Sequence, residues 1–266
     1  MPGHCGVAPR LSRRNDEKIA MTPGIAKYLK ESARKLGLEI QRYDTSSCEP
    51  AVLARFFSRH PVDLIIDVGA NEGQYIRLVR GVGYRGRIIA FEPLAQAHMR
   101  LRQLAATDKN LTVWPRMALG DYVGEVEVNV SANLASSSIL TMLDSHLAAA
   151  PHSVYVGREK VAIGRLDGCV SAEVNAARYA FLKVDTQGFE AAVLRGAAAL
   201  LPLVRAVQME LSFIELYERQ PLIRDMLNLM AEFGYSLYTF IPGFKDPKSG
   251  QMLQCDGVFV RRSEAE

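Results

Sequence analysis

The stretch Asp67-Val-Gly-Ala-Asn-Glu-Gly-Gln74 decides the fold, because it connects a short apolar run to a helical pattern. Residues 63–67 are predicted to form a buried strand, and residues 73–82 a helix that ends at Gly83. Gly69 permits a tight turn and a close approach of the backbone to a ligand. The free N–H groups at the start of the following helix favour a bound group. The stretch therefore predicts a strand–turn–helix unit with a ligand site at its turn.

Strands and helices alternate along the chain on both sides of this turn. We predict strands over residues 63–67, 87–92, 111–114, 179–184, 204–209, 235–241 and 256–262, and helices over 73–82, 94–106, 189–200 and 222–233. This alternation indicates an α/β fold with a parallel sheet and helices on both of its faces. The last two strands flank a loop rich in Pro and Gly, so we expect them to form an antiparallel hairpin.

The pattern predicts one main domain over residues 61–262, which carries a loop-rich insertion near residues 121–165. Two helices are expected within residues 22–60, as an N-terminal helical extension. Residues 1–21 are expected to be a disordered basic tail, and Met21 is a hypothetical natural start.

Composition excludes several classes of protein. The net charge of +3 comes from 32 basic and 29 acidic residues in 266, and no basic stripe indicates nucleic-acid binding. The 4 cysteines are far apart and form no CxxC pair, which argues against a zinc site or a disulfide framework. There is no secretory signal and no apolar run of the roughly 20 residues that span a bilayer. We therefore expect a cytoplasmic protein.

The spacing within the turn distinguishes between nucleotide cofactors. A dinucleotide site has the pattern GxGxxG, whereas Asn71 and Gln74 occupy its second and third glycine positions here. An acid at Asp67 is unfavourable beside a pyrophosphate, but favourable beside the sulfonium and ammonium of S-adenosylmethionine. Glu92, at the end of the next strand, can accept hydrogen bonds from both ribose hydroxyls. These residues predict S-adenosylmethionine as the cofactor.

Other cofactor contacts are expected further along the chain. After the third strand, the backbone of Ala118 and Leu119 is expected beside the adenine, although an ordinary turn into the next hairpin explains these residues equally well. Ser137, in the Ser136–Ser138 loop, is a candidate to bind the cofactor or the second substrate, with a flexible turn as the alternative. The predicted cofactor-binding residues are Asp67, Gly69, Asn71, Gly73, Glu92, Ala118, Leu119 and Ser137.

With these residues assembled, the chain resembles the FkbM family of methyltransferases over residues 62–262. The segments that carry the resemblance are Ile66–Gly73, Ala90–Pro93, Ala118–Asp121, Ser136–Ser138, Arg165–Asp167, Leu182–Glu190, Leu194–Gly196, Met209–Ser212 and Asp256–Phe259. The resemblance implies the class I methyltransferase, Rossmann-like fold, a seven-stranded and mostly parallel sheet whose last strand is antiparallel. It also implies methylation of a sugar hydroxyl on a glycolipid, a saccharide or a glycosylated natural product.

Methylation of a hydroxyl requires a general base, or a metal that lowers the pKa of the hydroxyl. Asp185 and Glu210 end two core strands and Glu190 begins a helix, so all three are candidates at the carboxyl edge of the sheet. The alternatives are that Glu190 only favours its helix N-terminus and that Glu210 pairs with an arginine. His152 is a secondary candidate base. Lys183 is expected to extend to solvent.

The placement of Asp185 and Glu210 resembles that of the ligands in magnesium-dependent O-methyltransferases, so Mg²⁺ is a hypothetical second cofactor. The open alternatives are an NAD(P)-dependent Rossmann oxidoreductase, a nucleic-acid methyltransferase, and a non-catalytic module that keeps the fold for binding. An NAD(P) site has the wrong glycine spacing here, and nucleic acid is not an expected partner. No transmembrane segment is expected, but a glycolipid acceptor would imply peripheral contact with the inner membrane face, aided by the basic N-terminal residues.

Overall fold

The computed structural model describes all residues except 1–22, 39, 41–42, 46–47 and 263–266. The chain divides into two compact units, one ending at Arg42 and one beginning at Tyr43. In the described part of the first unit, helix α1 (Pro23–Lys35) is followed by Gly37 in a left-handed conformation. The expectations for residues 1–21, including a start at Met21, lie outside the described residues.

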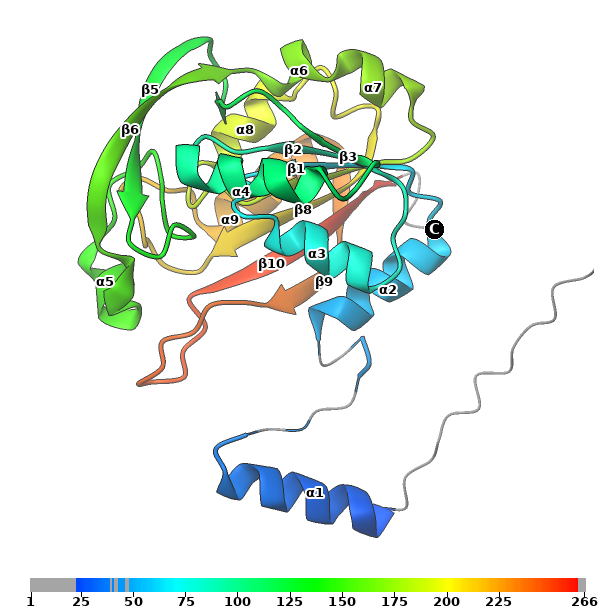
Figure 1. Cartoon of the computed structure of the whole chain (residues 1–266), viewed down its shortest axis with the longest axis vertical. Helices are drawn as coiled ribbons and strands as arrows, with labels where there is room; N and C mark the ends of the chain where they lie inside the picture. The colour runs from blue at the N-terminus through cyan, green and yellow to red at the C-terminus, as the bar shows by residue number, and fades with distance from the viewer. Residues whose placement is uncertain (1–22, 39, 41–42, 46–47, 263–266) are drawn as a thin grey trace, which may run out of the picture. The chain divides into compact units, whose positions relative to one another are not determined.

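The second unit is built on a seven-stranded sheet with the order β3-β2-β1-β7-β8-β10-β9 (Figure 1). The strands are β1 (Leu64–Val68), β2 (Arg87–Phe91), β3 (Leu111–Val113), β7 (Ala180–Val184), β8 (Val204–Ser212), β9 (Tyr235–Pro242) and β10 (Gln254–Arg261). Strands β1, β2, β3, β7 and β8 are paired in parallel, whereas β10 is antiparallel to both β8 and β9. The class I methyltransferase fold and the antiparallel hairpin predicted for the last two strands are confirmed.

Helices cover both faces of this sheet, as the sequence predicts. In β1 all five side chains are buried, because alternate residues point to opposite faces and each face is covered. Leu64, Ile66 and Val68 join one hydrophobic cluster, and Ile65 joins the other. One face is covered by α2 (Glu49–Arg59), α3 (Gln74–Gly81) and α4 (Ala95–Ala105), which lie in front of the sheet in Figure 1. The other face is covered by α6 (Leu166–Cys169), α7 (Ser171–Ala176), α8 (Glu190–Gly196) and α9 (Ile223–Glu232).

Helix α2 packs within the second unit, so this unit begins before residue 60. Leu53 and Phe56 of α2 are fully buried. The Phe56 ring lies 5.5 Å from that of Phe181 in β7, in an edge-to-face arrangement. The helix therefore contributes to the core beside the amino-terminal half of β7.

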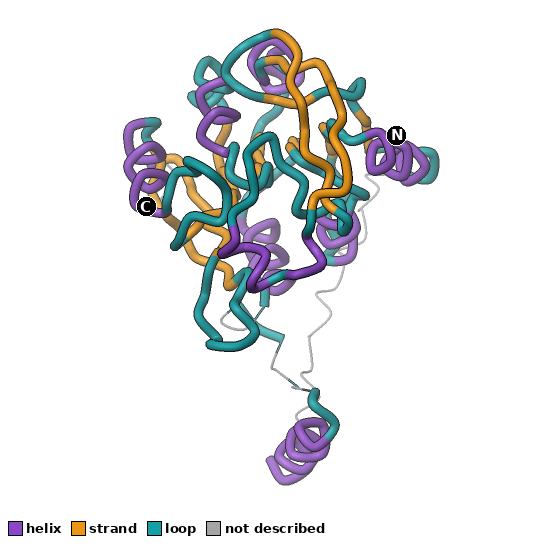
Figure 2. The backbone as a smooth tube through the Cα atoms, turned by 90° about the vertical axis from the view of Figure 1, so that its left-hand side faces the viewer, coloured by secondary structure: helices purple, strands orange, loops and turns teal. Residues whose placement is uncertain are grey.

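The expected insertion forms a second, three-stranded sheet with the order β4-β6-β5. Its strands are β4 (Ala118–Leu119), β5 (Gly124–Ser131) and β6 (Tyr155–Gly164), and β5 pairs with β6 in antiparallel fashion. Helix α5 (Asp144–Ala149) and the 3₁₀ turn η1 (Pro151–Ser153) lie between β5 and β6. Figure 2 shows the long β5–β6 pair as a layer apart from the main sheet. Val128, Val161 and Ile163 pack on Leu94 and Ala97 at the start of α4, so the insertion walls one side of the strand ends.

Candidate active site

The strand–turn–helix stretch forms the base of the site, at the carboxyl end of β1. Gly69 and Gly73 have positive φ angles of 80° and 85°. A Cβ atom on Gly69 would lie 1.9 Å from the carbonyl oxygen of Asp185, so only glycine lets the turn contact the loop after β7. The amides of Gly69 and Ala70 both donate to the carbonyl of Phe91. The turn is thereby fixed between β2 and the β7 loop.

Glu92, directly after β2, is oriented by this turn. Its Oε2 accepts a hydrogen bond from the Asn71 amide at 2.8 Å, and its Oε1 accepts one from the Leu94 amide at 2.8 Å. Burial raises the pKa of Glu92 to about 7. Because a carboxylate oxygen can accept more than one hydrogen bond, both oxygens keep capacity for the hydroxyls of a ligand.

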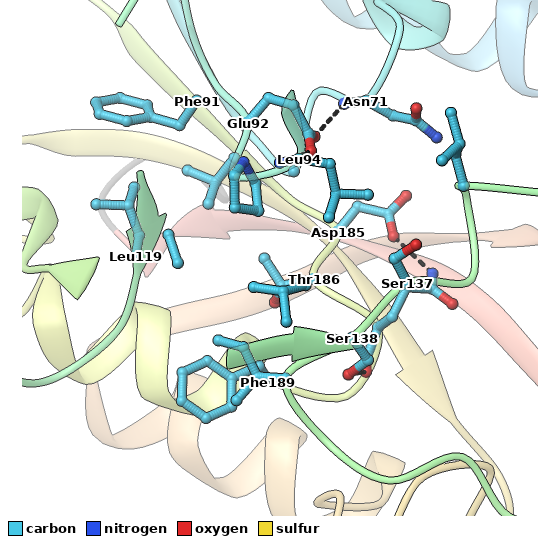
Figure 3. A pocket seen from close by; sticks show the side chains of 18 of the residues that line it. Asn71, Phe91, Glu92, Leu94, Leu119, Ser137, Ser138, Asp185, Thr186 and Phe189 are labelled. Atoms are coloured by element: carbon cyan, nitrogen blue, oxygen red, sulfur yellow. Dashed lines mark hydrogen bonds between the residues drawn. The ribbon is translucent and has the colours of Figure 1, made fainter. Parts of the chain in front are cut away.

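A cavity of about 580 Å³, including space open to solvent, lies between the turn, β4 and the Ser136–Ser138 loop. Figure 3 shows Glu92 and Asn71 on one side of it, with Leu119 and Phe189 at its apolar end. The predicted cofactor residues that line the cavity are Gly69, Asn71, Glu92, Ala118, Leu119 and Ser137. Gly73 instead faces α4, where a Cβ atom would lie 2.6 Å from Leu104.

Asp67 lines an adjoining hollow, together with Gln74, Tyr75, Lys183 and Asp185. Its Oδ2 is buried and has no hydrogen-bond partner among the described residues, and the same holds for the Oδ1 atom of Asn71. Burial raises the pKa of Asp67 to about 7, although Lys183 acts to lower it. Since buried acceptors are rarely left unpaired, these two atoms fit a ligand that brings donors, such as an ammonium group.

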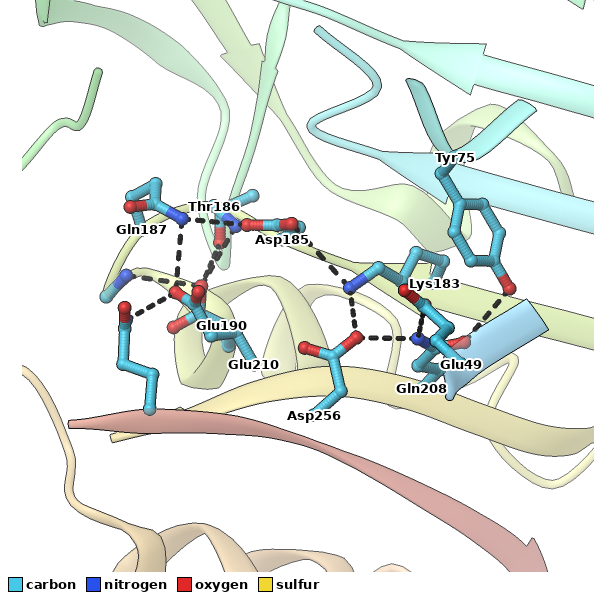
Figure 4. Close-up of polar contacts among 12 residues, drawn as sticks. Glu49, Tyr75, Lys183, Asp185, Thr186, Gln187, Glu190, Gln208, Glu210 and Asp256 are labelled. Carbon is cyan, nitrogen blue, oxygen red and sulfur yellow. Dashed lines mark hydrogen bonds and ion pairs between the residues drawn. The ribbon is translucent and has the colours of Figure 1, made fainter. Parts of the chain in front are cut away.

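The structure brings two of the predicted catalytic acids, Asp185 and Glu210, to one place. The side-chain amide of Gln187 donates to Asp185 Oδ1 at 2.9 Å and to Glu210 Oε2 at 3.1 Å (Figure 4). The Asp185 side chain keeps 38% of its surface exposed and lines both hollows. Burial and the nearby Asp185 raise the pKa of Glu210 well above its usual value. Of the two, Asp185 is therefore the carboxyl group that is open to a ligand.

Glu190 begins α8 and points into the turn that precedes it. Its Oε1 accepts hydrogen bonds from the Thr186 amide, the Thr186 hydroxyl and the Gly188 amide. Glu190 is 5% exposed, and burial raises its pKa. These hydrogen bonds hold the turn before α8 in place. His152 is exposed in η1 and is not among the residues that line the cavity, so its role as a base stays a prediction.

The expectation that Lys183 extends to solvent is wrong. Lys183 is 4% exposed, and its Nζ lies 2.9 Å from Asp256 Oδ2 and 3.6 Å from Asp185 Oδ2. Burial disfavours its charge, yet Asp256 and Asp185 raise the pKa of Lys183 well above its usual value. Gln208 donates to Asp256 at 2.6 Å and to Glu49 of α2 at 2.9 Å, which extends the network away from the site (Figure 4).

Residues two apart on a strand share a face, so the sequence held the signal that places Lys183 beside Asp185. The contact with Asp256 required the register of β8 against β10, which pairs Asp256 with Glu210. Gln187, Gln208 and Gln254 were also missed, because an uncharged amide carries no motif of its own.

The predicted magnesium site at Asp185 and Glu210 finds no support in this geometry. Within the described part of the chain, no three His, Cys, Asp or Glu side chains gather where they could hold a metal ion. The Oε2 atom of Glu210 accepts hydrogen bonds from two amides, those of Gln187 and Gln254. Magnesium therefore stays a prediction.

Comparison with known proteins gives one family match. The family described as "Methyltransferase FkbM domain" matches residues 67–237. The 2-O-methyltransferase NoeI of Sinorhizobium fredii (strain NBRC 101917 / NGR234) is 26% identical over 179 residues, which are 65% of this chain and 73% of NoeI.

Two solved structures resemble the chain more distantly. A methyltransferase FkbM from Methylobacillus flagellatus KT has a TM-score of 0.45 and 14% identity, over 75% of this chain and 43% of that one. The present chain thus spans less than half of that protein. Fibrillarin from Aeropyrum pernix, solved with natively bound S-adenosyl-L-methionine, has a TM-score of 0.41 and 13% identity, over 74% and 66% of the two chains.

Proposed function

We propose, from the premise that this chain belongs to the FkbM family of S-adenosylmethionine-dependent methyltransferases, that it methylates a hydroxyl oxygen of a sugar. The sugar would be part of a glycolipid, a saccharide or a glycosylated natural product. The name of NoeI, a 2-O-methyltransferase, supports oxygen as the acceptor atom. The observation that carries the proposal is that Glu92 and Asp185 face one cavity, beside Asp67, whose Oδ2 atom has no hydrogen-bond partner among the residues that the structure describes.

The cavity and the adjoining hollow together offer groups that suit the ribose, the adenine and the ammonium group of the cofactor. Glu92 would accept hydrogen bonds from the ribose hydroxyls, and Leu94, Leu119 and Phe189 would flank the adenine. Asp67 would face the ammonium group, which would donate a hydrogen bond to its Oδ2 atom. That atom has no other donor within the described part of the chain. When bound, S-adenosylmethionine supplies an electrophilic methyl carbon on a sulfonium leaving group.

Asp185 is the proposed general base. Methyl transfer forms a carbon–oxygen bond, breaks the carbon–sulfur bond and releases the proton of the acceptor hydroxyl, which the Asp185 carboxylate would take up. The Lys183 ammonium group lies 3.6 Å from Asp185 Oδ2 and holds this carboxyl group in place beside the hollow. The exposed fraction of Asp185 leaves it accessible to an acceptor that enters from solvent.

A glycolipid acceptor would require contact with a membrane surface. The described part of the chain contains no helix long and apolar enough to cross a bilayer. Helix α1, however, exposes Ile25, Tyr28 and Leu29 on one side, while Lys27 and Lys30 fall on the other at helical spacing. An apolar face bordered by lysines is typical of helices that lie in an anionic membrane interface. We propose peripheral contact with the inner membrane face through α1.

Calorimetric titration with S-adenosylhomocysteine tests the cofactor assignment. We expect binding to the native protein and an affinity at least about tenfold weaker for Glu92→Ala, because one charged hydrogen-bond partner is worth roughly 1.5–3 kcal/mol. Glu125→Gln is the matched control, since Glu125 pairs with Lys160 on the exposed face of the second sheet. Binding of NAD in place of S-adenosylhomocysteine would reject the assignment.

The acceptor class is tested separately. The protein is incubated with S-adenosylmethionine and with lipid or saccharide extracts of its source cells, and the products are analysed by mass spectrometry. A gain of one methyl group on a sugar hydroxyl is expected. Methylation found only on nitrogen, or only on nucleic acid, would contradict the proposal.

A further inference from the structure

The loop after β7 holds Gln187 in a conformation that side-chain-bearing residues rarely adopt. Its φ angle is 54°, in the left-handed region. The loop is held on both sides: the Ser138 hydroxyl donates to the Gln187 carbonyl at 2.7 Å, and Glu190 accepts from the Thr186 and Gly188 amides. Such a conformation persists only where the surroundings enforce it, and it is found mostly at functional sites.

The carboxamide of Gln187 has all of its groups engaged. Its Nε2 donates to Asp185 Oδ1 and to Glu210 Oε2, and its Oε1 accepts a hydrogen bond from the Tyr217 hydroxyl at 2.8 Å. Because the amide oxygen cannot donate, a flipped amide would point an acceptor at two carboxyl groups. The buried Tyr217 hydroxyl has one proton and two acceptors in reach, Gln187 Oε1 at 2.8 Å and the Ser136 carbonyl at 3.1 Å. The shorter contact to Oε1, together with the two carboxyl groups beside Nε2, sets which end of the amide faces Asp185.

We propose that Gln187 is a positioning residue for the methyl transfer, acting through Asp185. It holds Oδ1 of Asp185 while Lys183 lies near Oδ2, so the carboxylate is restrained from two sides with its open side toward the hollow. Glu210 accepts the second hydrogen bond from the same Nε2 atom, and Gln254 in turn donates to Glu210 at 2.6 Å. The inference rests on the proposed function, which makes Asp185 the base.

The competing interpretation is that Gln187 only ties the loop to β8 through Glu210. An exchange of groups distinguishes the two roles. In Gln187→Glu/Glu210→Gln an amide and a carboxylate still meet between positions 187 and 210, and the Tyr217 hydroxyl can still donate to residue 187. Gln254 and Gln187 donate to the same Oε2 atom of Glu210, so an amide at position 210 that donates to the new carboxylate at position 187 gives up the hydrogen bond from Gln254. The exchange thus keeps the contacts of residue 187 with residue 210 and with Tyr217, and it removes the donor to Asp185, which now faces a carboxylate.

The experiment compares the native chain, Glu210→Gln, Gln187→Glu and the exchange variant, so that the contribution of Glu210 itself cancels. The measurements are Tm, the affinity for S-adenosylhomocysteine, and kcat and KM for methyl transfer from S-adenosylmethionine to the source-cell extract. We expect the exchange to regain part of the Tm that Gln187→Glu loses, while its kcat stays about 100-fold below that of Glu210→Gln, the effect of a misplaced catalytic group. A kcat equal to that of Glu210→Gln would overturn the inference.

Tyr217→Phe gives a second test that adds no charge. Loss of its hydroxyl frees the amide to rotate, so we expect kcat to fall roughly tenfold while the affinity for S-adenosylhomocysteine changes by less than about threefold. An unchanged kcat in Tyr217→Phe would contradict the inference. Asn110→Asp, an amide-to-acid change in the turn before β3, is the control. Failure of the native chain to bind S-adenosylhomocysteine would reject the proposed function instead, a result separate from the comparison of Tm values.

Discussion

At the scale of single residues, the site keeps two buried carboxyl groups, Asp67 and Glu92, close to their titration point. Burial raises the pKa of each to about 7, from usual values near 4. At pH 6 both are therefore mostly neutral, and at pH 8 both are mostly charged. The charged forms are the ones that attract an ammonium group and accept from ribose hydroxyls.

These values predict that the affinity for S-adenosylhomocysteine rises as the pH increases from 6 to 8. The stability of the ligand-free protein changes with pH in the opposite direction. Because the folded pKa values exceed the unfolded ones, the folded state holds more protons between pH 4 and 7, and the free energy of unfolding falls as the pH rises through that window. Calorimetry and Tm measurements at pH 6, 7 and 8 test both trends. An affinity that does not change over this range would show that neither carboxyl group titrates on binding.

Replacement of Asp185 tests the proposed base. Asp185→Asn keeps the size of the side chain but cannot accept the proton from the acceptor, so we expect kcat to fall by about 10²–10⁴-fold. The affinity for S-adenosylhomocysteine should change little, since Glu92 and Asp67 are intact. Asn110→Asp again serves as control. Activity within threefold of the native value would require another base, with His152 as the next candidate.

At the scale of elements, most of the main sheet followed from the sequence because its strands are apolar on both faces. The central residues of these runs, Leu64–Ile66 and Ala180–Leu182, are apolar on both faces, which marks them as central strands. Helices α6 and α7 were missed, because four and six residues are too few to show a helical period. The sequence also does not predict that β5 pairs with β6, because a loop-rich segment with α5 separates the two strands.

The sequence predicts the parts of the site that lie within one motif. It does not predict the contacts that depend on which strands lie side by side. Gly69, Asn71 and Glu92 lie on two adjacent segments, so their position at one cavity was predictable, whereas their roles in cofactor binding stay predictions. Tyr217 reaches Gln187 from a distant loop, and Asp256 reaches Lys183 only through the order of β10 in the sheet.

Lys183 links β7 to Asp256 of β10 beneath the site, so its replacement should lower the free energy of unfolding. In Lys183→Met the carboxylates of Asp256 and Asp185 lose their cation, and removal of one partner of a buried pair costs about 3–5 kcal/mol. We expect the free energy of unfolding, measured with urea, to fall by a corresponding amount. It should recover in part in Lys183→Met/Asp256→Asn, which removes one of the two carboxylates left without a cation. If the single variant lost less than about 1 kcal/mol, the network would not support the core.

At the scale of the whole molecule, the small net charge of +3 conceals a local excess of positive charge in α1. Its residues include Lys27, Lys30, Arg34 and Lys35 against one acid, Glu31. Each lysine near an anionic surface contributes about 1 kcal/mol, an attraction that salt weakens. The exposed Ile25 and Leu29 would add the apolar contact that such helices require.

We therefore expect the full chain to sediment with vesicles that contain phosphatidylserine and to remain in solution with vesicles of phosphatidylcholine alone. Lys27→Glu/Lys30→Glu should weaken this binding by at least about tenfold, because two attractive charges become repulsive. Glu31→Gln, on the same helix, should bind at least as well as the native chain. S-adenosylhomocysteine titration of the same variants shows whether the second unit is intact. Equal binding of the native chain and the double variant would mean that α1 does not hold this protein at an anionic bilayer, and a soluble saccharide would then be the better acceptor class.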